Sequence, residues 1–344
     1  MSIDMELIER TIRKVVGEVG DQLTVLGGHD PAARGDGVFA TMDEAVTAAV
    51  RAQREYMSRT MADRKRYVQE IRAVVAKPEN LRFMAEETVR QTGMGDAEHK
   101  VLKNKVAGEN TPGVEDLVTE SWSGDDGLTA VEYSPYGVIG AITPTTNPTE
   151  TVICNSIGML AAGNAVVFSP HPRSKDITIW LVRELNQALC DAGAPANLLV
   201  TVADPSIENT NAMMAHPDIR MLVATGGPGI VKTVLSSGKK AIGAGAGNPP
   251  VLVDRTADIE KAAKDIVDGA SFDNNLPCTA EKEILADECI ADLLKFEMEK
   301  AGAFELKGVQ AVKKLEELVL NDRRSGPRTE WVGKSAIETL AQSV

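Results

Sequence analysis

Short apolar runs alternate with helical segments over residues 136–225, and this alternation restricts the possible folds more than any other feature of the chain. The runs YGVIGAIT, NAVVFS, NLLVTVA and IRMLVAT are almost continuously apolar, as is typical of strands buried on both faces. Helices are predicted between them, near 150–162, 174–192 and 206–215. We therefore predict a doubly wound α/β domain with a parallel sheet, which binds its ligands at the carboxyl ends of the strands.

Other regular segments surround this alternation. Three helices are predicted within residues 42–91, and the last ends before Gly93, a residue that commonly terminates helices. Residues 128–134 alternate like a strand after the turn-like sequence SGDDG. With 344 residues, 43% of them apolar, the chain is long enough for two domains rather than one.

The first 20 residues predict an amphipathic helix on a flexible tether. One face of this helix carries Ile8, Ile12, Val15, Val16 and Val19. Residues 21–37 are rich in Gly, Asp and Pro, which predicts a linker. Such a helix either docks on its own domain or buries its apolar stripe in a partner's groove, and the linker favours a partner.

The overall charge argues against two classes of partner. The chain has 37 Lys and Arg against 50 Asp and Glu, a net charge of −13, which repels nucleic acid and anionic membranes. No apolar run approaches the roughly 20 residues that span a bilayer. We therefore expect neither nucleic acid nor a membrane as a partner.

The four cysteines, Cys154, Cys190, Cys278 and Cys289, are widely spaced. They form no CxxC pair and no Cys/His cluster, so the sequence predicts neither a disulfide framework nor a metal site. This use of cysteine fits a reducing, cytoplasmic compartment.

Polar groups follow two of the predicted strands. In TPTTNP (143–148) the side-chain amide of Asn147 is placed to donate to a developing oxyanion. The alternative is an ordinary turn in which Asn147 or Thr149 caps the next helix. In SPHP (169–172) two prolines hold Ser169 and His171 at the same end of the sheet, although a lone His is more often structural or solvated.

Two glycine-rich segments have different predicted roles. TGGPG (225–229) ends a strand and opens a helix, an arrangement that favours an anion such as a pyrophosphate, with a simple tight turn as the alternative. GAGAG (243–247) looks like a dinucleotide fingerprint, but a strand pattern, NPPVLVD, follows it where the fingerprint requires a helix. We predict instead that its small residues let the backbone pass close to a reacting centre.

Cys278 lies in the polar segment FDNNLPCT, between a helix predicted at 257–270 and the segment EKEILAD. Cys154 and Cys190 lie in apolar surroundings, as inert cysteines usually do. The polar loop indicates an accessible thiol, with an inert structural cysteine as the alternative at this point.

Together these motifs resemble the aldehyde dehydrogenases in order and spacing, over essentially the whole chain. The segments QTGMG (91–95) and NTPGVEDL (110–117) are similar to the CoA-acylating propionaldehyde and acetaldehyde dehydrogenases of bacterial microcompartments, and the propionaldehyde branch looks closer. The resemblance implies an NAD-binding domain over 38–243 with an oligomerisation hairpin at 118–135. It also implies a partial α/β catalytic domain over 244–344.

The resemblance assigns chemical roles to these residues. Cys278 falls on the nucleophile that attacks the aldehyde and then carries a thioester once hydride has passed to NAD+. Asn147 and the backbone N–H of Cys278 fall on the oxyanion donors. The cofactor-binding loops would include Thr143, Pro144, Ser169, His171, Thr225, Gly226, Gly227 and Ile230.

A missing carboxylate points to the acyl acceptor. Hydrolytic aldehyde dehydrogenases have a Glu that activates water, and the matching position here is near Ala244. We therefore expect CoA to take the acyl group, converting propanal, CoA and NAD+ to propionyl-CoA and NADH. The alternatives are a hydrolytic aldehyde dehydrogenase and a non-catalytic NAD-binding or shell-binding module.

The resemblance also leads to an expectation for each end of the chain. Residues 1–20 would dock on a microcompartment shell protein and place the enzyme in the compartment lumen. Family members extend well past Val344, so we expect the rest of the catalytic domain and part of the interface of a homo-oligomer, dimer or tetramer, to be missing.

Overall fold

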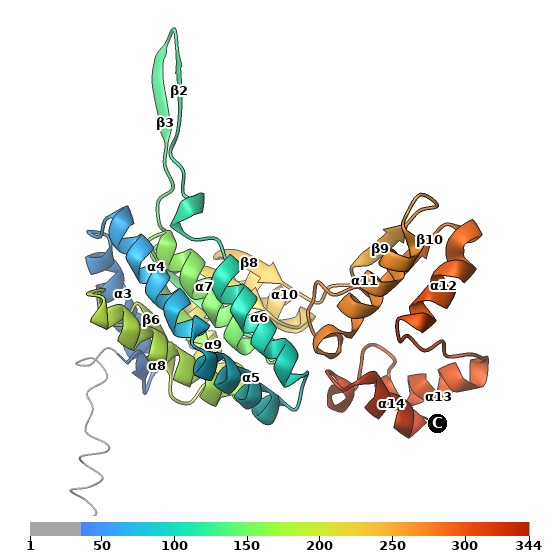
Figure 1. Cartoon of the computed structure of the whole chain (residues 1–344). Coiled ribbons are helices and arrows are strands. Elements are labelled where there is room, and N and C mark those ends of the chain that lie inside the picture. Colours follow the sequence, from blue (N-terminus) through green and yellow to red (C-terminus); the bar gives the residue numbers. More distant parts are fainter. Residues whose placement is uncertain (1–35, 344) are drawn as a thin grey trace, which may run out of the picture.

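The computed structural model describes residues 36–343. The helix predicted over residues 1–20 and the linker predicted over 21–37 lie outside the described residues, except for the linker's last two positions. Figure 1 shows three parts: a helix-covered sheet, a long hairpin that projects from it, and a smaller α/β part that contains the C-terminal elements.

The larger part is built on a six-stranded parallel sheet in the order β1-β6-β5-β4-β7-β8. Every residue of β4, β5 and β6 is buried, because both faces of the sheet are covered. This confirms the predicted doubly wound α/β fold. The strands are β1 Val38–Phe39, β4 Val138–Ile142, β5 Ala165–Ser169, β6 Leu199–Val202, β7 Ile219–Thr225 and β8 Lys240–Ala244.

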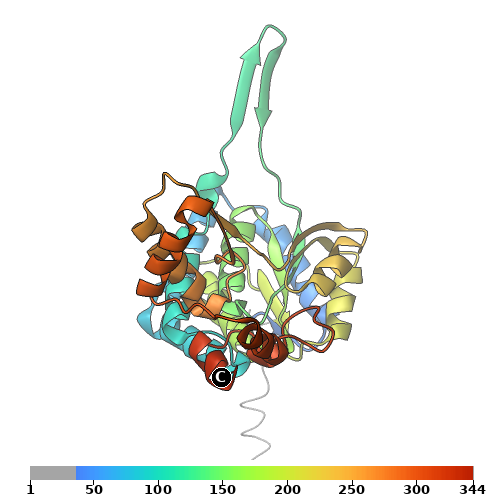
Figure 2. The same ribbon diagram turned by 90° about the vertical axis from the view of Figure 1, so that its right-hand side faces the viewer.

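Helices cover both faces of this sheet (Figure 2). Helices α7 and α8 pack together against one face, with α4 and α6 packed on them, and α5 packed against α6. Helices α3, α9 and α10 contact strands on the other face. The bounds are α3 Met42–Tyr56, α4 Met61–Ala76, α5 Pro78–Thr92, α6 Ala97–Asn110, α7 Pro148–Ala161, α8 Lys175–Asp191, α9 Ile207–Ala215 and α10 Pro228–Leu235.

Local sequence explains where several of these helices begin. Thr41 Oγ1 accepts the Glu44 N–H at 3.3 Å, and the Glu44 carboxylate accepts the Thr41 N–H at 3.0 Å. This reciprocal capping box satisfies two N–H groups that a helix start leaves unpaired. Thr60 and Asp63 form the same arrangement at the start of α4.

Helix α6 was not predicted from the sequence. Its buried face consists of Lys100, Asn104, Ala107 and Gly108, so it has no apolar stripe to recognise. The Asp96 side chain caps it by accepting the His99 N–H at 3.0 Å.

The predicted hairpin projects away from the rest of the chain (Figures 1 and 2). Strands β2 Glu120–Gly124 and β3 Gly127–Val131 are antiparallel, and every residue in both is exposed. Leu128 is 73% exposed. A two-stranded hairpin gains little stability by itself, so it needs a further surface to pack against.

The smaller part contains a second, two-stranded parallel sheet formed by β9 Pro250–Val253 and β10 Glu283–Ala286. It has its own apolar cluster of Val253, Ala263, Ile266 and Leu294. Its helices are α11 Ile259–Ser271, α12 Ala291–Lys300, α13 Val309–Val319 and α14 Ala336–Ser343. No helix among the described residues combines the length and the apolar character that crossing a membrane requires.

Candidate active site

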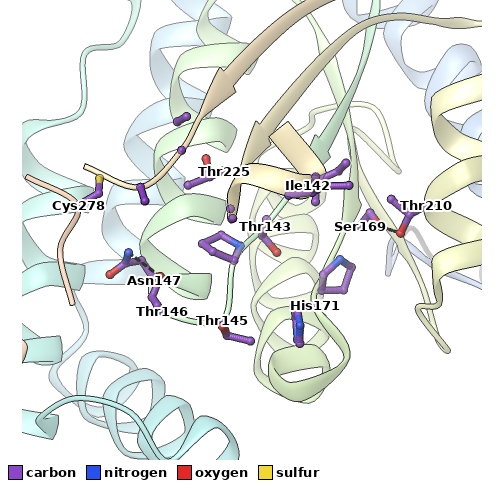
Figure 3. Close-up of a pocket in the computed structure, with 18 of the residues that line it drawn as sticks. Ile142, Thr143, Thr145, Thr146, Asn147, Ser169, His171, Thr210, Thr225 and Cys278 are labelled. Atoms are coloured by element: carbon purple, nitrogen blue, oxygen red, sulfur yellow. Dashed lines mark hydrogen bonds between the residues drawn. The ribbon is translucent and has the colours of Figure 1, made fainter. Parts of the chain in front are cut away.

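A pocket of about 670 Å³ opens at the carboxyl ends of β4, β5, β7 and β8, where the smaller part meets the large sheet. This is the position that doubly wound sheets use for their ligands. All ten site residues predicted from the sequence line this pocket: Thr143, Pro144, Asn147, Ser169, His171, Thr225, Gly226, Gly227, Ile230 and Cys278. Figure 3 shows Cys278 and Asn147 at one end, and Ser169 with Thr210 at the other.

Cys278 is exposed in a tight loop of the smaller part. The Ala280 N–H donates to the Pro277 carbonyl at 3.1 Å, and the Lys282 ammonium donates to the carbonyl oxygens of both Pro277 and Ala280 at 3.2 Å. These bonds hold the backbone around Cys278 and leave its thiol facing the pocket.

Gly247 passes directly against this loop. A Cβ at this position would overlap the carbonyl oxygen of Cys278 and lie 3.1 Å from its carbonyl carbon. Only glycine fits without movement of one backbone. The prediction that the small residues of GAGAG allow a close backbone approach is therefore confirmed at Gly247.

Asn147 begins helix α7, but its side chain does not cap that helix. Its Oδ1 accepts a hydrogen bond from the Lys103 ammonium, and its Nδ2 donates to Thr146 Oγ1 at 3.1 Å. An amide nitrogen has two N–H groups, so one remains available to the pocket. Asn147 therefore occupies the N-cap position that the alternative predicted for it, but neither its side chain nor that of Thr149, whose Oγ1 donates to Glu150 Oε2 at 3.2 Å, caps the helix.

Two lysines of α6, Lys100 and Lys103, contact residues of the site. The Lys103 ammonium contacts Asp273 Oδ2 at 2.6 Å and Glu150 Oε1 at 3.2 Å, and the Lys100 ammonium contacts Asp273 Oδ2 at 3.0 Å. Burial, together with the nearby Lys103 charge, lowers the pKa of Lys100. Burial also acts against the charged form of Lys103, but the carboxylates of Glu150 and Asp273 outweigh it and raise its pKa.

The segment leading to Cys278 has an unusual backbone. Asp273, Asn274 and Asn275 all have positive φ, at 48°, 53° and 60°. Asp and Asn adopt this left-handed conformation more readily than other side-chain-bearing residues, which explains their use here. The Asn275 amide donates to the Ala270 and Glu281 carbonyl oxygens at 2.7 and 3.1 Å, which closes the loop that contains Cys278.

The far end of the pocket offers groups suited to a dinucleotide. Ser169 Oγ and Thr210 Oγ1 are hydrogen-bonded at 2.8 Å, and His171 Nδ1 accepts a hydrogen bond from the Arg173 N–H at 3.1 Å. Burial and the Arg173 charge lower the pKa of His171, so the ring is neutral at pH 7 and its proton lies on Nε2. Helix α10 starts after Gly227 without a side-chain cap, and the space beside Gly227 is open. This arrangement allows an anionic group to approach the helix N-terminus.

None of the described residues that line the pocket is Asp or Glu. Ala244, near which the resemblance places the Glu of hydrolytic aldehyde dehydrogenases, lies on the pocket wall. Within residues 36–343, no three His, Cys, Asp or Glu side chains are grouped as metal ligands would be.

Comparison with known proteins identifies the family. The aldehyde dehydrogenase family matches residues 35–305. The chain belongs to this family. Propanal dehydrogenase (CoA-propanoylating) of Salmonella typhimurium is 48% identical over 296 residues, which cover 86% of this chain and 63% of the relative. The chain thus spans less than two thirds of the length of that relative.

Solved structures of other aldehyde dehydrogenases resemble this one. The propionaldehyde dehydrogenase of Rhodopseudomonas palustris with bound propionyl-CoA is 64% identical, with a TM-score of 0.86, over 90% of this chain and 68% of that structure. The propionaldehyde dehydrogenase of the Clostridium phytofermentans fucose utilisation bacterial microcompartment is 48% identical, with a TM-score of 0.85, over 89% and 70%.

Four charged residues beside the pocket of this aldehyde dehydrogenase were not predicted from the sequence: Lys100, Lys103, Glu150 and Asp273. Their contacts join residues more than forty positions apart, such as Lys103 and Asn147, which no local pattern encodes. The available hint was the pair of lysines one helical turn apart in a segment that lacks an apolar face.

Proposed function

We propose that this aldehyde dehydrogenase oxidises a short aliphatic aldehyde, propanal, with NAD+ and transfers the acyl group to CoA. One observation carries the proposal: the exposed thiol of Cys278 shares a pocket with the Asn147 amide, and within residues 36–343 no carboxylate side chain lines that pocket. The names of the relatives support the substrate class, since the Salmonella typhimurium protein is a CoA-propanoylating propanal dehydrogenase.

Cys278 is the nucleophile of the first step. Its sulfur attacks the aldehyde carbon, a carbon–sulfur bond forms, the carbonyl electron pair moves to oxygen, and the thiol proton leaves to solvent. The free N–H of Asn147 and the backbone N–H of Cys278 stabilise the negative oxygen. NAD+ supplies the hydride acceptor that converts this thiohemiacetal to a thioester.

The second step releases the acyl group from Cys278. With no Asp or Glu among the described residues of the pocket wall, water has no carboxylate to act as its general base, so the thioester resists hydrolysis. The CoA thiolate attacks the thioester carbonyl, its new carbon–sulfur bond replaces the bond to Cys278, and the Cys278 thiolate leaves. The same donors stabilise the oxyanion in this step.

The loops at the strand ends hold the cofactor in this proposal. The start of α10, with Thr225, Gly226, Gly227 and Ile230, would face the pyrophosphate. Thr143, Pro144, Ser169 and His171 would line the remaining length of the dinucleotide. Residues 38–243 would therefore form the NAD-binding domain, and residues 244–344 would contribute to the catalytic domain.

We further propose that the chain works as a homo-oligomer inside a bacterial microcompartment. The exposed hairpin within 118–135 would pair with a second copy, and residues 1–20 would bind a shell protein. The Clostridium phytofermentans relative, a microcompartment protein, supports the location.

The deciding experiment measures NADH formation from propanal with and without CoA. We expect CoA-dependent NADH formation that Cys278→Ala abolishes, with a propionyl thioester on Cys278 detected by intact-protein mass. NADH formation that is equally fast without CoA would indicate a hydrolytic enzyme instead.

A further inference from the structure

The Lys103 ammonium contacts three side-chain oxygen atoms. It donates hydrogen bonds to Asn147 Oδ1 and Asp273 Oδ2 and forms an ion pair with Glu150 Oε1 at 3.2 Å, and the Lys103 side chain is only 12% exposed. Asn147 and Glu150 belong to the start of α7, and Asp273 belongs to the segment that leads to Cys278. One buried cation thus joins the oxyanion donor to the nucleophile's loop.

Lys100 reinforces the same connection. Its ammonium donates to the Thr146 carbonyl at 3.2 Å and to Asp273 at 3.0 Å, and its side chain is completely buried. Asp273 in turn accepts the Asp96 N–H at 2.8 Å at the start of α6. The two lysines therefore hold the turn at residues 146–147 and Asp273 against one rigid helix.

We propose that Lys103 is a positioning residue that orients the Asn147 carboxamide, so that its N–H rather than its oxygen faces the oxyanion on the Cys278 adduct. The inference rests on the function proposed above. In Figure 3 the amide nitrogen of Asn147 is on the side of the group toward Cys278.

The chemistry of the two side chains supports this assignment. A lysine ammonium is a donor only, so it donates to the oxygen of the amide and disfavours an orientation in which the amide nitrogen, also a donor, faces it. Without it, a half-turn of the carboxamide would place a lone pair against the developing negative charge. Such a flip exchanges one oxyanion donor for a repulsive contact.

A purely structural role is the alternative. In that case Lys103 would only neutralise Glu150 and Asp273, and its loss would affect folding or the pocket in general. The two roles differ in one respect. An orienting residue loses its effect once the amide it orients has been removed, whereas a structural residue does not.

The test uses the transfer of a propionyl group from propionyl-CoA to Cys278 in the full chain, followed by intact-protein mass. The Cys278 thiolate attacks the propionyl carbonyl, the carbon–sulfur bond to CoA breaks, and CoA leaves as its thiolate, which takes a proton from solvent, so no redox cofactor is needed. Lys103→Met keeps the length of the side chain and removes the donor. Lys105→Met is the matched control, because Lys105 lies exposed on the same helix and pairs only weakly with Glu109, at 4.0 Å.

We expect Lys103→Met to slow acyl transfer by about tenfold to a hundredfold, while Lys105→Met leaves the rate unchanged. In an Asn147→Ala background, adding Lys103→Met should slow transfer by less than about twofold further. If Lys103→Met does not fold, as judged by its thermal unfolding midpoint, the same double-mutant cycle is run with Lys103→Gln.

Two results would overturn the inference. One is a wild-type rate in folded Lys103→Met, and the other is an equal loss of rate with and without the Asn147 amide. Failure of the proposed function is a different result, since the unsubstituted chain would then show no more propionyl adduct than Cys278→Ala. That result would overturn both proposals.

Discussion

Gly247 and Cys278 pack backbone against backbone, so that a Cβ on Gly247 would overlap the carbonyl oxygen of Cys278. The two residues come from different segments, one after β8 and the other after the left-handed turn at 273–275. Their contact involves the carbonyl group of Cys278, the residue whose backbone N–H is one of the two proposed oxyanion donors. A side chain at position 247 is therefore expected to displace the backbone of the nucleophile Cys278.

We expect Gly247→Ala to displace the Cys278 loop. Propionyl transfer from propionyl-CoA to Cys278 should slow by at least about tenfold, and overpacking should lower the free energy of unfolding by about 1–3 kcal/mol. Gly158→Ala is the control, because a Cβ at Gly158 meets nothing within 4 Å and Gly158 lies in α7, outside the residues that line the pocket. Equal rates in the two variants would show that the close contact does not position the thiol.

Introducing a carboxylate on the pocket wall should change the acyl acceptor. Ala244→Glu would place a general base where water can attack the Cys278 thioester. We expect NADH formation from propanal without CoA to rise by about tenfold or more, below the roughly 10²–10⁴-fold that a well-placed base provides. Ala244→Gln has the same size without the base and should show no rise. A rise in both variants would point to altered access of water instead.

The alternation of strands and helices from residue 136 made the large sheet predictable, because burial on both faces requires apolar runs. The pocket loops were predictable for a related reason, since they directly follow those strands. Helix α6 was not predictable, because the face it buries contains Lys100 and Asn104 rather than apolar residues. The contact of Lys103 with Asn147 depends on tertiary packing and has no local sequence pattern.

The neutral state of His171 should make stability depend on pH. Burial and the Arg173 charge lower the pKa of His171 in the folded chain below the usual 6.5. At a pH just below 6.5, His171 is therefore protonated to a greater extent in the unfolded chain than in the folded chain. Its contribution to stability is therefore present above pH 6.5 and is lost as the pH falls from there through the lowered pKa. We expect the stability of the unsubstituted chain to fall between pH 7 and pH 5 more than that of His171→Gln, measured by urea unfolding at each pH. Identical pH profiles would contradict the prediction.

Deleting residues 1–20 should separate location from catalysis. Because the proposed pocket lies entirely within residues 142–282, the kinetic constants should not change. The deleted chain should no longer co-purify with microcompartment shells, whereas a chain with only part of the linker shortened should remain with them. Unchanged encapsulation after the deletion would refute the targeting role.

The hairpin should determine the oligomeric state. All residues of β2 and β3 are exposed, including Leu128 at 73%, and a two-stranded hairpin has little stability of its own. If a second copy covers it, Leu128→Asp buries an unpaired charge in the interface and should weaken association by at least about tenfold. Met57→Asp is the control, because Met57 is 50% exposed and lies at the end of α3, outside the hairpin. Sedimentation over a range of protein concentrations measures the strength of association of both variants. A weakening that is the same for the two variants would indicate a general effect of added charge, and an interface elsewhere on the chain would then have to hold the copies together.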